Sequence, residues 1–263
     1  MALTVQQLRD RFETKDGSRP AATSLGDDVG RTIPLTAFSV LQGAGTAFEG
    51  ANLPSDLDAA HRAAQVFVVD DVSDERLRQR IHTDIRKMLV HNPRLAARVQ
   101  RMKPVRVDVV AVGVALSSVG FPRSVDEGVA GVFWDHPSWR EARIGFRSEH
   151  LVSDPVLVVH EVAHALHRLA FTSGEQKAID DVLLPVVGAR NAVDELFAIY
   201  SEAEHLVAFG VDEKRAPGIY GWARRQWSDQ HLFTRFVRKL YFPARPLAGD
   251  DAPKAAAWKK FSG

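Results

Sequence analysis

The feature that most constrains this chain is a short apolar segment that contains three ionisable side chains. Residues 156–166 read VLVVHEVAHAL, so every side chain except His160, Glu161 and His164 is aliphatic. A helix of this composition must be buried, because no face of it is suited to water. Two imidazoles and a carboxylate are costly to bury unless something compensates them. The segment therefore predicts a buried helix with a compensated polar cluster.

The spacing of these three residues predicts a zinc site. His160 and His164 are four positions apart, so on a helix they point the same way, one turn apart. Two such imidazoles can bind one Zn²⁺ ion at about 2.0–2.1 Å. Glu161 lies about 100° away around the helix, where it could take a proton from a zinc-bound water and pass it to a leaving amine. The alternative is a chance occurrence of the pattern in a helix that binds no metal.

A catalytic zinc ion needs a third protein ligand and one open position. The chain has no cysteine, so that ligand must be His, Asp or Glu. We expect Glu195, which lies beside an apolar stripe in a predicted helix over 191–209 and would gain from a cation there. Glu202 and Asp194 are the alternatives.

His167 does not complete the zinc site in this interpretation. It lies on the same face as His160 and His164, but it rises about 10.5 Å from His160 along the helix axis, too far for both to bind one ion. We expect it to line the pocket or to support a ligand. The metzincin pattern needs a glycine at position 167 and a histidine at position 170, where the chain has His167 and Ala170, so that class is excluded.

A family resemblance rests on two segments, HEVAHALH and the later DELFA. Together they resemble the gluzincin metallopeptidases, and within them the group similar to the catalytic domain of anthrax lethal factor. The resemblance covers roughly residues 105–210. It implies a zincin-like fold, with His160, His164 and Glu195 as zinc ligands and Glu161 as the catalytic base. It also implies that an extended peptide substrate pairs with a strand before the active-site helix.

The chain departs from that family in two places. Lethal-factor-like enzymes have a tyrosine shortly before the third ligand, and the stretch VVGARNAVD contains none. A carboxylate often follows the ligand glutamate by four residues, where this chain has Ile199. Tyr220, in a glycine-flanked segment, is the expected catalytic donor to the oxyanion, with Tyr200 and His231 as alternatives.

The whole chain predicts an α+β fold with a small twisted mixed sheet, an active-site helix and a mostly helical C-terminal part. Either 128–136 or 142–151 would be the strand that pairs with the substrate. Hydrophobic periodicity, β-branched runs and capping residues predict the following elements. They are helices over 55–67, over 74–90 with Ser73 as N-cap, and from Pro93; strands over 105–116, 128–136 and 142–151; and helices from Asp154-Pro155 to Phe171 and over 191–209, with a linker between them from Ser173.

Three regions follow from these patterns: an irregular N-terminal arm over 1–52, a zincin-like metallopeptidase domain over 53–242 and a C-terminal tail over 243–263. Basic residues number 34 and acidic residues 33, so no electrostatic footprint for nucleic acid is present. No apolar run of about 18 residues predicts a membrane span, and the N-terminus does not resemble a Sec signal peptide. We expect a cytoplasmic protein, or one exported by a route that does not read such a signal.

These features predict a zinc-dependent endopeptidase that acts on a peptide or protein substrate. A catalytically silent, zinc-binding module that recognises peptides is the alternative, although such a module would have no use for Glu161. A helical interaction protein with an accidental motif, which binds no metal, is the third interpretation.

Overall fold

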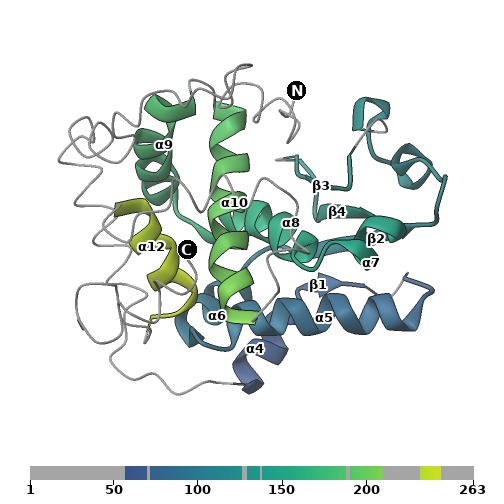
Figure 1. The fold of residues 1–263 in the computed structure, drawn as a ribbon, viewed down its shortest axis with the longest axis horizontal. Helices are drawn as coiled ribbons and strands as arrows, with labels where there is room; N and C mark the ends of the chain where they lie inside the picture. Colours follow the sequence, from purple (N-terminus) through teal and green to yellow (C-terminus); the bar gives the residue numbers. More distant parts are fainter. Residues whose placement is uncertain are drawn as a thin grey trace.

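The computed structural model describes residues 57–69, 72–125, 129–136, 138–187, 190–209 and 232–243. It has an α+β fold, a four-stranded mixed open sheet with helices, and its C-terminal part is mostly helical (Figure 1). The strands are β1 (Phe67–Val68), β2 (Val105–Val110), β3 (Gly131–Trp134) and β4 (Ala142–Arg147). The helices are α4 (Leu57–Ala64), α5 (Glu75–Leu89), α6 (Pro93–Val99), α7 (Ser148–Ser153), α8 (Leu157–Ala165), α9 (Ser173–Val187), α10 (Arg190–Phe209) and α12 (Leu232–Tyr241). A π turn spans Leu166–Ala170, and short 3₁₀ turns cover Leu116–Val119 and Arg123–Val125.

Several predicted features fall outside this part of the chain. They are the arm over 1–52, all but the first residue of the tail over 243–263, and the segment that contains Tyr220. Among the helices that are described, none is both long and apolar enough to cross a membrane.

The sheet has the strand order β1-β2-β4-β3, so β2 and β4 are its inner strands. β1, β2 and β4 run parallel, whereas β3 pairs antiparallel with β4, from Gly131↔Phe146 to Trp134↔Arg143. The valine-rich sequence of β2 suits an inner strand that is covered on both faces. The strand β3 therefore lies at one edge of the described sheet.

The helix α8 lies between the sheet and the helices α9, α10 and α12 (Figure 1). It packs against α5, α10 and β3. Every residue of α8 except His160 is buried, and its aliphatic side chains belong to the main hydrophobic core. The prediction of a buried helix over this apolar segment is confirmed.

The structure corrects two predicted boundaries near the start of the described chain. Phe67, which is expected at the end of the first helix, begins β1 and pairs with Val105. The β-branched residues that follow it favour a strand over a further helical turn. The N-cap of α5 is Asp74 and not Ser73, because the carboxylate of Asp74 accepts hydrogen bonds from two backbone N–H groups of the first turn.

Two predicted boundaries before α8 are also wrong. The strand expected over 142–151 ends at Arg147, and the helix α7 follows it directly. Asp154 accepts a hydrogen bond from the backbone N–H of Val156, as a capping residue does, but α8 itself begins only at Leu157. A short helix and a capping turn thus separate the sheet from α8.

The linker that the sequence predicts from Ser173 is the helix α9. Thr172 and Glu175 form a capping box at its start: the backbone N–H of Thr172 donates to Glu175 Oε2 at 2.8 Å, and the backbone N–H of Glu175 donates to Thr172 Oγ1 at 3.3 Å. Arg98 of α6 pairs with the same carboxylate at 2.7 Å. A helix therefore starts where Gly174 indicates a break.

Candidate metal centre

Three side chains from two helices converge at the interface between α8 and α10. His160 and His164, one turn apart on α8, have their Nε2 atoms 3.1 Å apart. Glu195 of α10 places its Oε2 atom 3.4 Å from His160 Nε2 and its Oε1 atom 3.7 Å from His164 Nε2. The three side chains are 10–13% exposed, so an ion among them would be largely shielded from bulk water. His160, His164 and Glu195 thus form a triad that could hold one metal ion.

The second ring nitrogen of His160 binds another carboxylate of α10. His160 Nδ1 donates a hydrogen bond to Glu202 Oε1 at 2.7 Å, and Glu202 is buried. Metal-binding histidines usually have such a carboxylate on their outer nitrogen, because it fixes the tautomer and orientation of the ring. Glu202, which the sequence left open as the third ligand, therefore binds the Nδ1 side of the His160 ring, whereas Glu195 and His164 lie at its Nε2 side.

Burial and charge give the two histidines opposite protonation preferences. Burial lowers the pKa of His160, but the Glu202 and Glu195 carboxylates outweigh it and raise that pKa well above its ordinary value. Burial lowers the pKa of His164 to about 4, so this ring is neutral near pH 7. Burial acts to raise the pKa of Glu195, but the two imidazoles lower it overall. In the metal-free chain, His160 is therefore protonated at pH 7, and its positive charge faces Glu195 where a metal cation would bind.

The carboxyl group of Glu161 is buried against the edge strand β3. The backbone N–H of Phe133 donates a hydrogen bond to it, and a Cβ atom on Gly131 would lie 2.7 Å from Glu161 Oε1. Burial, reinforced by the Glu195 and Glu202 carboxylates, raises the pKa of Glu161 to about 8. Gly131 is the sequence signal for this contact, because a glycine inside a strand indicates a close approach of another group.

Substitution of Gly131 by Ala is expected to lower the free energy of unfolding by about 1–3 kcal/mol. The new methyl group would lie 2.7–3.0 Å from three atoms of Glu161, so either β3 or this side chain must move. Urea denaturation of both proteins measures the difference. Gly174→Ala is the matched control, since a methyl group there meets no atom within 4 Å.

A double variant identifies the source of this loss. The cost of Gly131→Ala should largely disappear in a Glu161→Ala background, because the atoms that collide with the new methyl group are then absent. An equal loss in both backgrounds would show that the strain arises elsewhere in β3.

The third histidine of the segment, His167, binds a different carboxylate. It lies in the π turn that follows α8, and its Nδ1 atom donates a hydrogen bond to Asp194 Oδ1 at 2.5 Å. Arg168 binds the other oxygen of the same carboxylate. Asp194, the second alternative for the third ligand, is thus paired with His167 and Arg168.

Of the three predicted donors to the oxyanion, Tyr200 alone lies among the described residues. Tyr220 and His231 lie outside the described residues, so Tyr220 stays a prediction. Tyr200 packs in the hydrophobic core, and burial raises its pKa to about 12. Ile199, at the position where the resembling family often has a carboxylate, belongs to the same core.

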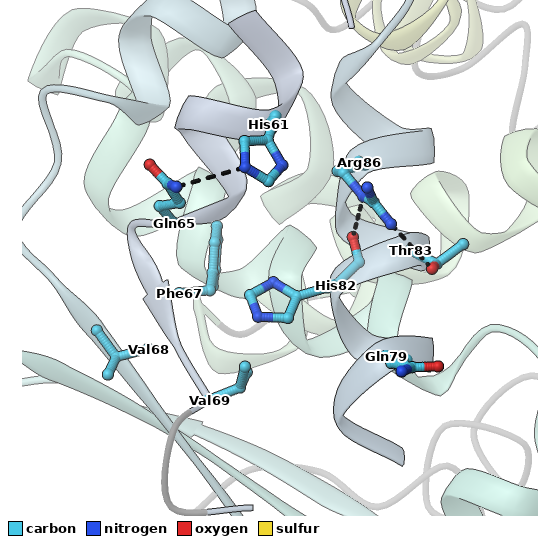
Figure 2. Close-up of a pocket in the computed structure, with 9 residues that line it drawn as sticks. All are labelled: His61, Gln65, Phe67, Val68, Val69, Gln79, His82, Thr83 and Arg86. Atoms are coloured by element: carbon cyan, nitrogen blue, oxygen red, sulfur yellow. Dashed lines mark hydrogen bonds between the residues drawn. The ribbon is translucent and has the colours of Figure 1, made fainter. Parts of the chain in front are cut away.

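A separate cavity of about 550 Å³ lies between α4, β1 and α5 (Figure 2). Arg86 lies beside it and donates hydrogen bonds to the backbone carbonyl of His82 and to the hydroxyl of Thr83. The cavity is lined by His61, Gln65, Phe67, Val68, Val69, Gln79, His82, Thr83 and Arg86. None of these residues belongs to the triad, so the cavity is distinct from the metal centre.

The geometry of the candidate metal centre is the main guide to function. Comparisons with protein-family models, with curated proteins and with solved structures gave no match. The function is therefore inferred from the residues of the site and from the chemistry that they can perform.

Proposed function

We propose that this protein is a zinc-dependent endopeptidase of the gluzincin type, with residues 53–242 as a zincin-like metallopeptidase domain. The observation that carries the proposal is the convergence of His160, His164 and Glu195, with the buried carboxyl group of Glu161 on the same helix as the two histidines. A site that only binds metal needs no such carboxyl group, whereas hydrolysis by a metal-activated water needs a general base.

The donor set and its dimensions suit zinc. Two imidazole nitrogens and one carboxylate oxygen are a common ligand set of catalytic zinc sites, in which the fourth position stays open. Donor atoms about 2.0–2.1 Å from a tetrahedral ion lie roughly 3.3 Å from one another. The two imidazole Nε2 atoms, 3.1 Å apart, lie close to that value. Glu195 places Oε2 3.4 Å from His160 and Oε1 3.7 Å from His164, and one donor atom from each of the three residues lies within 4.8 Å of the other two.

Each residue has a defined task in the proposed reaction. Zinc held by the triad supplies a Lewis acid for the scissile carbonyl and lowers the pKa of a water molecule. Glu161 accepts a proton from the attacking water and passes it to the leaving amine. Because Glu161 is buried against β3, bulk water does not compete for that proton. Tyr220 is our candidate for the side chain that donates to the oxyanion.

The edge strand β3 is the proposed binding place for the substrate backbone. Of the two segments that the sequence left open, Ala142–Arg147 is paired on both sides, whereas Gly131–Trp134 lies at an edge of the described sheet. An extended peptide adds to a sheet only at an edge, through backbone hydrogen bonds. β3 also contacts Glu161, so a peptide bound there would lie beside the proposed base.

Metal analysis combined with a peptide library tests this proposal. We expect one zinc ion per chain in untagged protein by elemental mass spectrometry, and cleavage of library peptides that a chelator stops and added zinc restores. Zinc without any cleavage by the wild type would favour the silent recognition module. Protein that takes up no zinc even after reconstitution would contradict the metal site and favour a helical interaction protein.

Zinc binding at pH 7 is expected to release at least one proton per ion. The raised pKa of His160 keeps this ring protonated in the metal-free chain, so the proton must leave before the ring can bind metal. Zinc affinity should therefore fall about tenfold for each pH unit below that raised pKa and level off above it. Calorimetric titrations in buffers of different ionisation enthalpy count the released protons. Zinc binding without proton release would mean that His160 is already neutral.

A further inference from the structure

The contacts between α8 and α10 continue along the interface beyond the metal triad. Three histidines of α8 and its π turn face three carboxylates of α10 in antiparallel order: His160 with Glu202, His164 with Glu195, and His167 with Asp194. The first two of these pairs contain the metal ligands. The third contains none, so its role needs a separate explanation.

The pair of His167 and Asp194 is held by several contacts. Asp194 accepts a hydrogen bond from His167 at 2.5 Å, and its second oxygen binds Arg168. The π turn places more residues in each turn than an α-helix does, which lets two consecutive side chains reach one carboxylate. The ring of His167 also stacks on Phe197 of α10, with 5.1 Å between the ring centroids.

Packing alone does not account for a histidine at position 167. The side chain of His167 is 3% exposed, and its Nε2 atom has no hydrogen-bond partner among the described residues. An apolar side chain would fill the same space without leaving a buried nitrogen unsatisfied. The hydrogen bond to Asp194 is therefore the property that an apolar residue could not supply.

We propose that His167 and Asp194 are a positioning pair that sets where Glu195 lies relative to the two metal-binding histidines. The inference rests on the proposed metal centre. Asp194 directly precedes Glu195 in α10, and Phe197 follows two residues later, so His167 contacts α10 on both sides of the ligand in sequence. A rotation or shift of this part of α10 would carry the Glu195 carboxylate with it. The pair thereby controls the affinity and the geometry of the metal site.

Binding of Co²⁺ alone tests the proposal, because its absorption spectrum reports coordination geometry without a substrate. His167→Phe keeps the aromatic stacking and removes the hydrogen bond, whereas His167→Asn keeps an N–H near the position of Nδ1 and removes the ring. Asp194→Asn removes the charge and keeps the shape. Asp181→Asn is the matched control, since Asp181 is a carboxylate of α9 that pairs with the exposed Lys177.

We expect His167→Phe and Asp194→Asn to weaken Co²⁺ binding by roughly 10–100-fold and to shift the absorption spectrum. His167→Asn should recover most of the affinity, because it can still donate to Asp194. The control Asp181→Asn should change neither the affinity nor the spectrum. Thermal denaturation of each metal-free protein verifies that it is folded before metal is added.

The outcomes separate this inference from the proposed function. Wild-type affinity and spectrum in both His167→Phe and Asp194→Asn, with or without a loss of stability, would overturn the positioning role and leave the metal centre intact. Wild-type protein that binds no Co²⁺ would overturn the metal centre and this inference with it. If His167→Phe does not fold, Asp194→Asn decides the test. The side chain of Asp194 is 16% exposed, against 3% for His167, so its substitution should disturb folding less.

Discussion

Glu161→Gln is expected to abolish peptide hydrolysis while the chain keeps one zinc ion. Glutamine has the shape of glutamate but cannot take a proton from water, and general-base catalysis typically contributes about 10²–10⁴-fold to a rate. The fold should tolerate the change, because burial raises the pKa of Glu161 to about 8 and the metal-free carboxyl group is mostly neutral at pH 7. An amide is a close copy of that neutral acid. A zinc ion beside Glu161 would lower that pKa and ionise the carboxyl group for its role as base.

Cleavage rate and zinc content, measured on one preparation of the Glu161→Gln protein, separate the base from the metal site. Glu149→Gln is the control, since Glu149 lies on α7, accepts a hydrogen bond from Ser148 and does not belong to the triad. Joint loss of zinc and activity would mean that Glu161 supports the metal. Unchanged cleavage would assign the base to another residue.

Glu195→Ala is expected to remove most of the zinc affinity. Only two imidazoles of the triad remain in this variant, so the loss should exceed the roughly 100-fold upper range for residues that support a ligand. A metal that binds only the folded state stabilises it by about 2.7 kcal/mol at 100 times its Kd. Excess zinc should therefore raise the Tm of the wild type and leave the Tm of Glu195→Ala nearly unchanged.

Thermal denaturation with and without zinc, together with elemental analysis, measures the effect of Glu195→Ala. Asp181→Ala is the control for removal of a carboxylate from a neighbouring helix, and its response to zinc should match that of the wild type. Full zinc affinity in Glu195→Ala would contradict the ligand assignment and point to Glu202 or Asp194, the alternatives that the sequence left open.

Local sequence patterns predict most helices and strands of the described fold, but they miss β1, α7 and α9 and misplace several ends. The buried run of β2 and the amphipathic pattern of α5 depend on residues within a few positions of one another. Phe67 fits the spacing of the preceding helix, but its pairing with Val105 makes it part of a strand. The start of α9 is locally encoded by the capping box of Thr172 and Glu175, although Gly174 between them favours a break.

The triad could be proposed from the sequence because a local property favours each member, although Glu202 and Asp194 stay open as alternatives to Glu195. The four-residue spacing of His160 and His164 places both rings on one side of a helix. Glu195 follows from the cost of a carboxylate beside an apolar stripe, which a cation removes. Both arguments need only helical geometry and the physics of desolvation. The structure brings these three side chains together between α8 and α10.

Only the tertiary structure decided how three carboxylates of one helix are shared. Glu202 binds the outer nitrogen of His160, Asp194 binds His167, and Glu195 is left to face the Nε2 atoms of His160 and His164. The sequence could not separate them, because the choice depends on the register between α8 and α10. The edge position of β3, and the contact of Gly131 with Glu161, depend in the same way on strand order. Both depend on packing between segments that are distant along the chain. A local sequence pattern carries no information about such packing.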